Sequence, residues 1–367
     1  MTAALSLARP TSAMLFARGS LSAHLLSLET IRQIGSETFG WQPAAKTFHL
    51  MSCDVLAELC GRSSLSNGST DLAASDCRSL GNERGGPAMK TILVPTQNIS
   101  AMGSALETAV LLARRTGAYI EGIPLWFGVP EFVVAELASG FSMEIYRARR
   151  DEETAGARKL FETFMHDHGI PSAKTGEDRP WFGWFDAVSP GESLVGSHGR
   201  TFDVIVMSRP DADTAAPYNR AIESALFESG RPVLLAPPVA PKQIATNIMI
   251  HWNGSTEQAR ANAFAMPLLR MAPRVTVLTV VGGQGVPGPS ADQVRKQLRC
   301  NGIAAEQLSM NVEGRSTGET VLAAAAKQGC DLLIKGAFTR NRLRQMMFGG
   351  ATSHIMQHAD LPVLMAH

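Results

Sequence analysis

Glycines near the end of the chain are spaced as in a loop that binds phosphate. A short apolar run ends at Gly336, an arginine-rich loop follows, and the pair Gly349 and Gly350 precedes a segment with helical character. Glycine at the end of a strand lets the backbone approach a ligand without a Cβ clash. The first N–H groups of a helix lack intrahelical partners, and the helix dipole favours an anion there. The sequence therefore predicts an anion site at the carboxyl edge of a parallel sheet, without the Gly-Lys-Ser/Thr ending of a P-loop.

The chemistry expected of this loop is the binding of a nucleotide's phosphates. The N–H groups around Gly349, Gly350 and Ala351 would bind phosphate oxygens, and Thr352 would add a hydroxyl. Arginine pairs well with phosphate, and three arginines precede the glycine pair: Arg340, Arg342 and Arg344. The structural alternative is that the glycines only allow a strand and a helix to pack closely, with the arginines in solvent. The residues by themselves leave both interpretations open.

The same loop resembles the nucleotide motif of a known family. In universal stress proteins the motif is Gly-x2-Gly-x9-Gly-Ser/Thr, and the matching places here hold Gly336, Thr339, Gly349 and Gly350. The spacing matches, but Thr339 and Gly350 depart from the motif, with Thr352 two residues further on. The resemblance implies ATP as the ligand, and the two departures indicate that the ATP-binding form of the motif is only partly kept.

The opposite wall of the site is also implied by the resemblance. In the family an aspartate after the first strand lies in the adenosine pocket, and Asn253 holds that place in the chain. An earlier copy of the pattern has Gln97 there. Both side chains keep hydrogen-bonding groups without the charge, and Asn followed by Gly is also an ordinary turn signal. By the same resemblance, Val280 would offer backbone groups to an adenine.

Residues that could carry catalysis or bind a metal are scarce. His251 is the only histidine near the predicted pocket, and His354 and His358 are four residues apart without a third ligand. Glu192 and Glu319 follow glycines at expected helix starts, where capping explains them. We therefore predict a protein that is not an enzyme and has no metal site, with slow ATP hydrolysis as a third option.

Composition limits the class of protein and its partners. The 367 residues predict two or three domains, and 45% hydrophobic with 18% charged residues is typical of a globular chain. A net charge of +1 gives no reason to expect nucleic acid as a partner, and no apolar run is long enough to predict a membrane-spanning helix. The five cysteines form no CxxC pair, which favours free thiols in a reducing compartment.

The first 88 residues differ from the rest of the chain. They are rich in Ser, Ala and Leu, lack sustained periodicity and end in a glycine-rich stretch. Such a composition does not bury enough apolar surface to offset chain entropy. Two hypotheses remain: a disordered leader, or translation that begins at Met89, directly before the first expected strand.

From Met89 onward the sequence predicts a duplication. The apolar strands at 90–95 and 247–251 are each followed by an amphipathic helix, and similar strand–helix pairs recur later in both copies. Apolar strands without alternation, separated by helices, indicate a parallel sheet covered on both faces. We therefore predict an α/β fold of two tandem doubly wound domains of universal stress protein type, at residues 89–240 and 243–367.

The two copies differ at the site. In the first copy, residues 208–218 replace the glycine loop with acids and prolines, and residues 220–223 replace the glycine pair, which predicts a degenerate site. An aromatic run at 181–185 has helical spacing interrupted by Gly183, and we expect it in the core or at an interdomain contact.

The resemblance implies a cytoplasmic bacterial stress-response protein. Its two copies would pack as a pseudo-dimer through the strands at 233–236 and 363–366, with a homodimer as a further option. Two function classes stay open: a nucleotide-binding signalling protein with ATP in the second copy only, or an interaction module with both sites degenerate. Neither involves nucleic acid or a membrane.

Overall fold

The structure is a computed structural model that describes residues 89–126, 140–176, 179–186, 192–209, 215–283, 285–338 and 350–367. The predictions for residues 1–88, for Thr339 and Gly349, and for the three loop arginines lie outside these ranges. Among the helices in these ranges, none combines the length and apolar character needed to cross a membrane.

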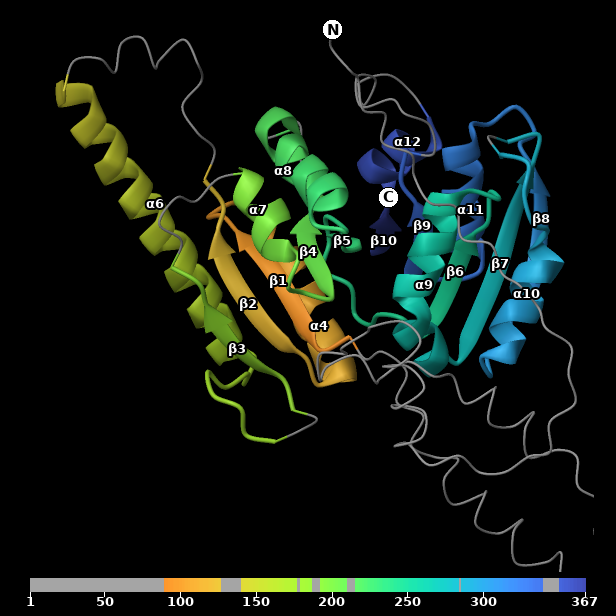
Figure 1. The fold of residues 1–367 in the computed structure, drawn as a ribbon, viewed down its shortest axis with the longest axis horizontal. Coiled ribbons are helices and arrows are strands. Elements are labelled where there is room, and N and C mark those ends of the chain that lie inside the picture. The colour runs from red at the N-terminus through yellow and green to blue at the C-terminus, as the bar shows by residue number, and fades with distance from the viewer. Residues whose placement is uncertain are drawn as a thin grey trace, which may run out of the picture. The chain divides into compact units, whose positions relative to one another are not determined.

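Ten strands form a single sheet (Figure 1). They are β1 (Thr91–Thr96), β2 (Tyr119–Pro124), β3 (Trp181–Trp184), β4 (Val204–Ser208), β5 (Val233–Ala236), β6 (Asn247–His251), β7 (Arg274–Val281), β8 (Glu306–Asn311), β9 (Leu332–Gly336) and β10 (Val363–Ala366). Their order is β3-β2-β1-β4-β5-β10-β9-β6-β7-β8. Neighbouring strands of this described set are parallel except β5 and β10, which are antiparallel.

Helices cover both faces of the sheet. They are α4 (Met102–Thr116), α6 (Gly140–Asp167), α7 (Glu192–Gly199), α8 (Ala215–Glu228), α9 (Thr256–Met271), α10 (Ala291–Cys300), α11 (Thr317–Lys327) and α12 (Ala351–His358). One apolar cluster packs α4, α6, α9 and α10 on one face, and a second packs α7, α8, α11 and α12 on the other. Strands buried on both faces have no reason to alternate, which explains the unbroken apolar runs. The predicted α/β class with a doubly wound, mostly parallel sheet is confirmed.

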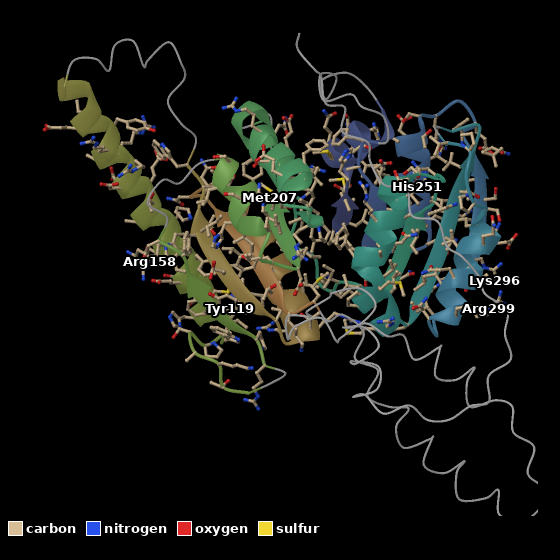
Figure 2. All side chains as sticks on the ribbon, viewed as in Figure 1. Tyr119, Arg158, Met207, His251, Lys296 and Arg299 are labelled. Atoms are coloured by element: carbon tan, nitrogen blue, oxygen red, sulfur yellow. The ribbon has the colours of Figure 1, made fainter. Side chains whose placement is uncertain are left out.

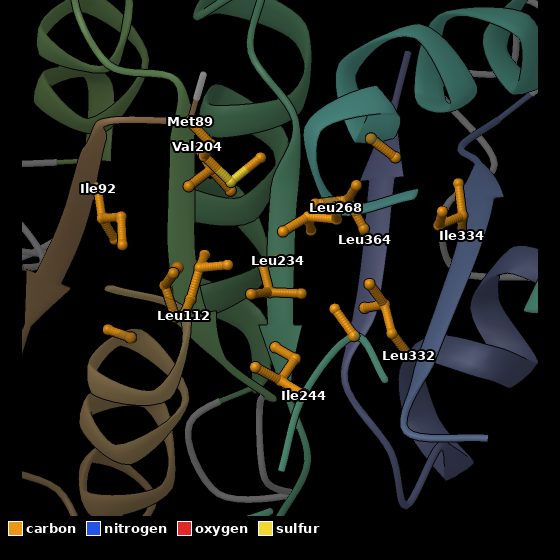
Figure 3. Packing of buried hydrophobic residues seen from close by; sticks show 14 of the residues in the cluster. Met89, Ile92, Leu112, Val204, Leu234, Ile244, Leu268, Leu332, Ile334 and Leu364 are labelled. Carbon is orange, nitrogen blue, oxygen red and sulfur yellow. The ribbon is translucent and has the colours of Figure 1, made fainter. Parts of the chain in front are cut away.

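The strands before and after residue 240 have the same order. We call β1–β5 with their helices the first half, and β6–β10 with theirs the second half. In each half the first strand lies between the second and the fourth, and the fifth lies beside the fourth. The halves meet where β5 pairs with β10, with Leu364 opposite Leu234 (Figure 3). These are the two strands that the sequence analysis placed at a contact between copies.

Side-chain caps fix the starts of α9, α10 and α11 in the second half. The Ser255 hydroxyl accepts from the N–H of Gln258 at the start of α9. Capping boxes open α10 at Ser290 and α11 at Ser316, where the Ser316 N–H donates to Glu319 Oε2 at 2.7 Å. Each box satisfies two N–H groups that the helix leaves free. The predicted capping role of Glu319 is confirmed.

The aromatic run at 181–185 is not helical, which corrects the expected spacing. Residues Trp181–Trp184 form strand β3 beside β2. Phe182 is buried and Trp184 packs against Phe161 of α6, so the expected place in the core is correct. A Cβ on Gly122 would lie 2.6 Å from the Trp184 ring, so this glycine admits the aromatic side chain.

Candidate functional site

A cavity of about 350 Å³ lies at the carboxyl ends of β6 and β7. Its lining includes His251, Asn253, Val280 and Thr317. The chain runs from β6 outward to β7 and β8, and then returns to β9 on the other side of β6. A crevice at such a change of direction is where parallel α/β sheets bind ligands. The cavity therefore occupies the ligand-binding edge of the second half.

Two loops that pack closely together hold one wall of the cavity. Gly254 has φ +80°, and a Cβ there would lie 2.6 Å from the carbonyl oxygen of Val286. The indole N–H of Trp252 donates to the carbonyl of Pro289 at 2.7 Å. Only glycine adopts this backbone readily and leaves room for the second loop. The wall is thus fixed by backbone packing before any ligand arrives.

Asn253 lies where the sequence analysis placed it, on the cavity wall, and it also makes a turn. Its Oδ1 accepts from the N–H of Ser255 at 3.2 Å. This bond supports the turn interpretation, and the position on the cavity wall supports the adenosine interpretation. Val280 lines the same cavity near the end of β7.

Gly336 has a packing role that the sequence left open. A Cβ at this position would lie 2.4 Å from the backbone nitrogen of Gln258 and 2.7 Å from the carbonyl carbon of Glu257. The N–H of Gly336 donates to Gln258 Oε1 at 2.7 Å. The start of α9 therefore fills the space above this glycine, so close strand–helix packing accounts for it.

Helix α12 begins beside the end of β9, as predicted. Gly350 precedes it with φ 138°, a backbone that other residues rarely adopt, and within the described residues no side chain caps the helix. Ala351 and Thr352 are buried in its first turn. Among the described residues, the first N–H groups of this helix therefore have no side-chain partner.

Lys335 is a component of this region that the sequence analysis missed. Its side chain is only 3% exposed, and its ammonium donates to the carbonyl of Gly336 at 2.8 Å and to Thr352 Oγ1 at 2.9 Å. Burial lowers the pKa of Lys335 to about 8. No Asp or Glu in the described ranges forms an ion pair with it. The available signal was a lysine inside an otherwise apolar strand.

His251 connects the cavity with Lys335. It is 3% exposed, and its Nδ1 is buried without a hydrogen-bond partner among the residues that the structure describes. Burial, together with the positive charge of Lys335, lowers the pKa of His251 to about 3, so the imidazole is neutral near pH 7. Because side chains alternate along a strand, both groups lie on the face of the sheet covered by α11 and α12.

The first half has different residues at the matching positions. The strand pairings align Met207 of β4 with Lys335, and Pro95 of β1 with His251. Met207 lies in the first half and His251 in the second (Figure 2). Ser208 replaces Gly336, and its hydroxyl donates to Tyr218 Oη at 2.7 Å. Tyr218 is fully buried, which raises its pKa to about 12, and its ring occupies the end of β4.

Gln97, the first-half residue predicted at the place of Asn253, lines a separate cavity of about 490 Å³ between β2 and α6.

In the second half, His354 and His358 stack face to face with ring centroids 4.2 Å apart. In the described part of the chain, no group of three or more His, Cys, Asp or Glu residues could hold a metal ion. The absence of a metal site stays a prediction.

Comparison with known proteins identifies the second half. Residues 246–367 match the model of the universal stress protein family. No curated protein has a sequence that matches this chain. A universal stress protein from Archaeoglobus fulgidus superposes with a TM-score of 0.59 at 12% identity, covering 76% of this chain and 96% of that one. Universal stress protein UspA from Lactobacillus plantarum gives a TM-score of 0.28 at 18% identity, covering 34% of this chain and 100% of that one. The first likeness supports the fold, and the family model shows that residues 246–367 are a universal stress protein domain.

Proposed function

We propose that the chain is a cytoplasmic stress-response protein that binds one adenine nucleotide in its second half. The observation that carries this proposal is the cavity lined by Asn253 and Val280 at the ligand-binding edge of the sheet. The base and ribose would occupy this cavity. The phosphates would extend toward the first turn of α12, where free N–H groups and the helix dipole favour an anion. Gly350, Ala351 and Thr352 form that turn, while Thr339 and Gly349 would complete the loop.

The first half supports this proposal by contrast. At the end of β4, where the second half has Gly336, the buried ring of Tyr218 and the side chain of Ser208 occupy the space. The first half therefore has a serine bonded to a buried tyrosine where the second half has a glycine. Nucleotide binding is accordingly proposed for the second half alone.

A pair of cavity-filling variants tests the proposal. Gly285 lines the second-half cavity, and a Cβ there has ordinary clearance, with the nearest atom at 3.7 Å. Gly156 lines the first-half cavity with similar clearance, at 3.9 Å. We expect adenine nucleotide to co-purify with the full chain and with Gly156→Leu, and to be lost from Gly285→Leu.

Mass spectrometry of the denatured protein's supernatant makes this measurement, with circular dichroism as the control for folding. Nucleotide retained by Gly285→Leu, or lost only from Gly156→Leu, would place the site elsewhere. Absence of nucleotide from all three proteins, together with no binding of added ATP, would favour the alternative of an interaction module with two degenerate sites.

We further propose that bound ATP is held rather than turned over efficiently. His251 is the histidine on the cavity wall, and its pKa of about 3 makes it a weak base, whereas effective general bases have a pKa near the working pH. We expect hydrolysis on the order of one event in many minutes or slower, against roughly 1–1000 per second for common enzymes. A phosphate-release assay on the full chain, with Gly285→Leu alongside, measures this rate. Release above about 1 per second that Gly285→Leu abolishes would make the protein an ATPase.

A further inference from the structure

A buried positive charge lies at the end of β9. The side chain of Lys335 is 3% exposed, and none of the acids within the described ranges forms an ion pair with it. Moving an ammonium ion out of water is unfavourable unless it is paired, so buried charges usually have a partner of opposite sign. In this region the described residues provide only neutral acceptors, the Gly336 carbonyl and the Thr352 hydroxyl.

The fold itself does not require a lysine at this position. The strand pairing that joins Lys335 to Met365 is matched in the first half by the pairing of Met207 with Leu235. Met207 is fully buried in the apolar cluster on that face. A methionine thus meets the packing needs of the same strand position, and the charge of Lys335 calls for another explanation.

The groups around the ammonium point to an anion as its missing partner. Two of its three protons are donated to Gly336 and Thr352, and the third has no acceptor among the described residues. Thr352 belongs to the first turn of α12, whose N-terminal end carries partial positive charge. A lysine ammonium and a helix N-terminus together bind phosphate oxygens in many proteins.

His251 is the residue of the cavity wall that interacts with this charge. It lines the cavity wall, and its interaction with Lys335 shows that the two side chains are near each other. The buried Nδ1 of His251 lacks a partner in the residues described, so the polar groups on this face form an incomplete network. Pro95 and Met207 stand at the two positions in the first half, so neither polar group is present there.

We infer that Lys335 binds the phosphate of the ligand and makes the second-half site selective for phosphorylated over unphosphorylated adenosine compounds, with binding coupled to protonation of Lys335. The inference rests on the proposed nucleotide site. Lys335 sets the specificity, Thr352 orients its ammonium, and neutral His251 separates the charge from the base-binding part of the cavity.

The other titratable groups on the elements packed around Lys335 are few. They are His251 on β6, Glu257, Arg260 and Arg270 on α9, Glu319 and Lys327 on α11, His354 and His358 on α12, and His367 after β10. Glu257 Oε1 accepts from the hydroxyl of Thr256, while Glu257 Oε2 is buried without a partner among the described residues, and Glu319 is used in the capping box. Of these groups, His251 is the one that interacts with Lys335.

The test compares ATP with adenosine on three full-length proteins. Lys335→Met installs the residue that the first half has at this position. Lys327→Met removes one exposed lysine at the end of α11, so the change in net charge is the same. We expect Lys335→Met to lower the affinity for ATP by about 10- to 100-fold, as for loss of a charged hydrogen bond. The affinity for adenosine should change by less than about twofold. Lys327→Met should match the wild type.

The pH dependence gives a second readout that a purely structural lysine would not change. The pKa of Lys335 in the unliganded protein is about 8, so its charge changes between pH 7 and 9. Wild-type affinity for ATP should fall over this interval with uptake of protons on binding, measured by calorimetry in two buffers of different ionisation enthalpy. Adenosine binding, and ATP binding to Lys335→Met, should show neither effect.

The outcomes separate this inference from the proposed function. If wild-type protein binds ATP, and Lys335→Met binds it with the same affinity and pH profile, the role of Lys335 is wrong and the nucleotide site stands. If the variant does not fold, proton uptake by the wild type still decides, and its absence at pH 8.5 contradicts the inference. If the wild type binds neither ATP nor adenosine, both proposals are overturned.

Discussion

At the scale of single residues, the burial of Lys335 should reduce the stability of the unliganded protein. Burial lowers its pKa from 10.5 to about 8, and a difference of this size corresponds to roughly 3 kcal/mol. The folded protein binds the proton more weakly than the unfolded chain, so stability rises as the pH increases from 8 to 10.5. Below pH 8 the full penalty applies.

The prediction is that Lys335→Met is more stable than wild type by about 1–3 kcal/mol at pH 7, and that the difference nearly disappears by pH 10.5. Urea unfolding at the two pH values measures it, with Lys327→Met as the exposed control. A variant less stable than wild type at pH 7 would show that the hydrogen bonds to Gly336 and Thr352 outweigh the burial of charge. Greater stability with weaker ATP binding would be a usual trade-off at a functional site.

The sequence predicted some residues of the site and missed others for physical reasons. The family resemblance pointed to Asn253 and Val280, and both line the cavity, while their role in binding stays a prediction. Lys335 was missed because the sequence pattern marks it as part of a buried strand but does not show which groups its ammonium contacts. One of these groups is the hydroxyl of Thr352, which lies seventeen residues later on another element. Gly336 was assigned a ligand role, and its packing against α9 required the position of the helix.

At the scale of elements, the end of β9 and the start of α9 are packed without room for a side chain. Gly336→Ala should destabilise the protein by about 1–3 kcal/mol, because the added Cβ meets backbone atoms that cannot rotate away. Gly285→Ala is the control, since its Cβ has ordinary clearance. Thermal unfolding of the two variants makes the comparison. Equal melting temperatures would show that α9 can shift, and would return Gly336 to a ligand-binding interpretation.

Elements were predictable where burial left a periodic pattern. Buried strands such as β5 and β10 are unbroken apolar runs, so their type was clear. The edge strand β8 was not predicted, because its residues are largely exposed and polar and depend on pairing with β7. The residues of strand β3 were given a helical spacing, because the sequence does not show that Trp184 packs over Gly122 of the neighbouring strand.

At the scale of the whole described chain, two halves of the same strand order carry different chemistry. The second half has Lys335, His251 and Gly336 at the carboxyl ends of its strands. The first half has Met207, Pro95 and Ser208 at those places, with Tyr218 over the strand end. The sheet continues from one half to the other through β5 and β10. The tandem duplication, the pseudo-dimer and further association stay predictions, and the asymmetry between the halves supports a single site.

Titration of the full-length protein with ATP by calorimetry tests the single nucleotide site most directly. We predict one ATP bound per chain, because the cavity at the ends of β6 and β7 lies in the half that keeps Gly350 before α12, whereas Ser208 and buried Tyr218 stand at the end of β4 in the first half. Gly156→Leu should leave this ratio unchanged, and Gly285→Leu should abolish the binding heat. Two ATP molecules per chain would show that the first half also binds nucleotide, and the absence of any binding would contradict the proposed function.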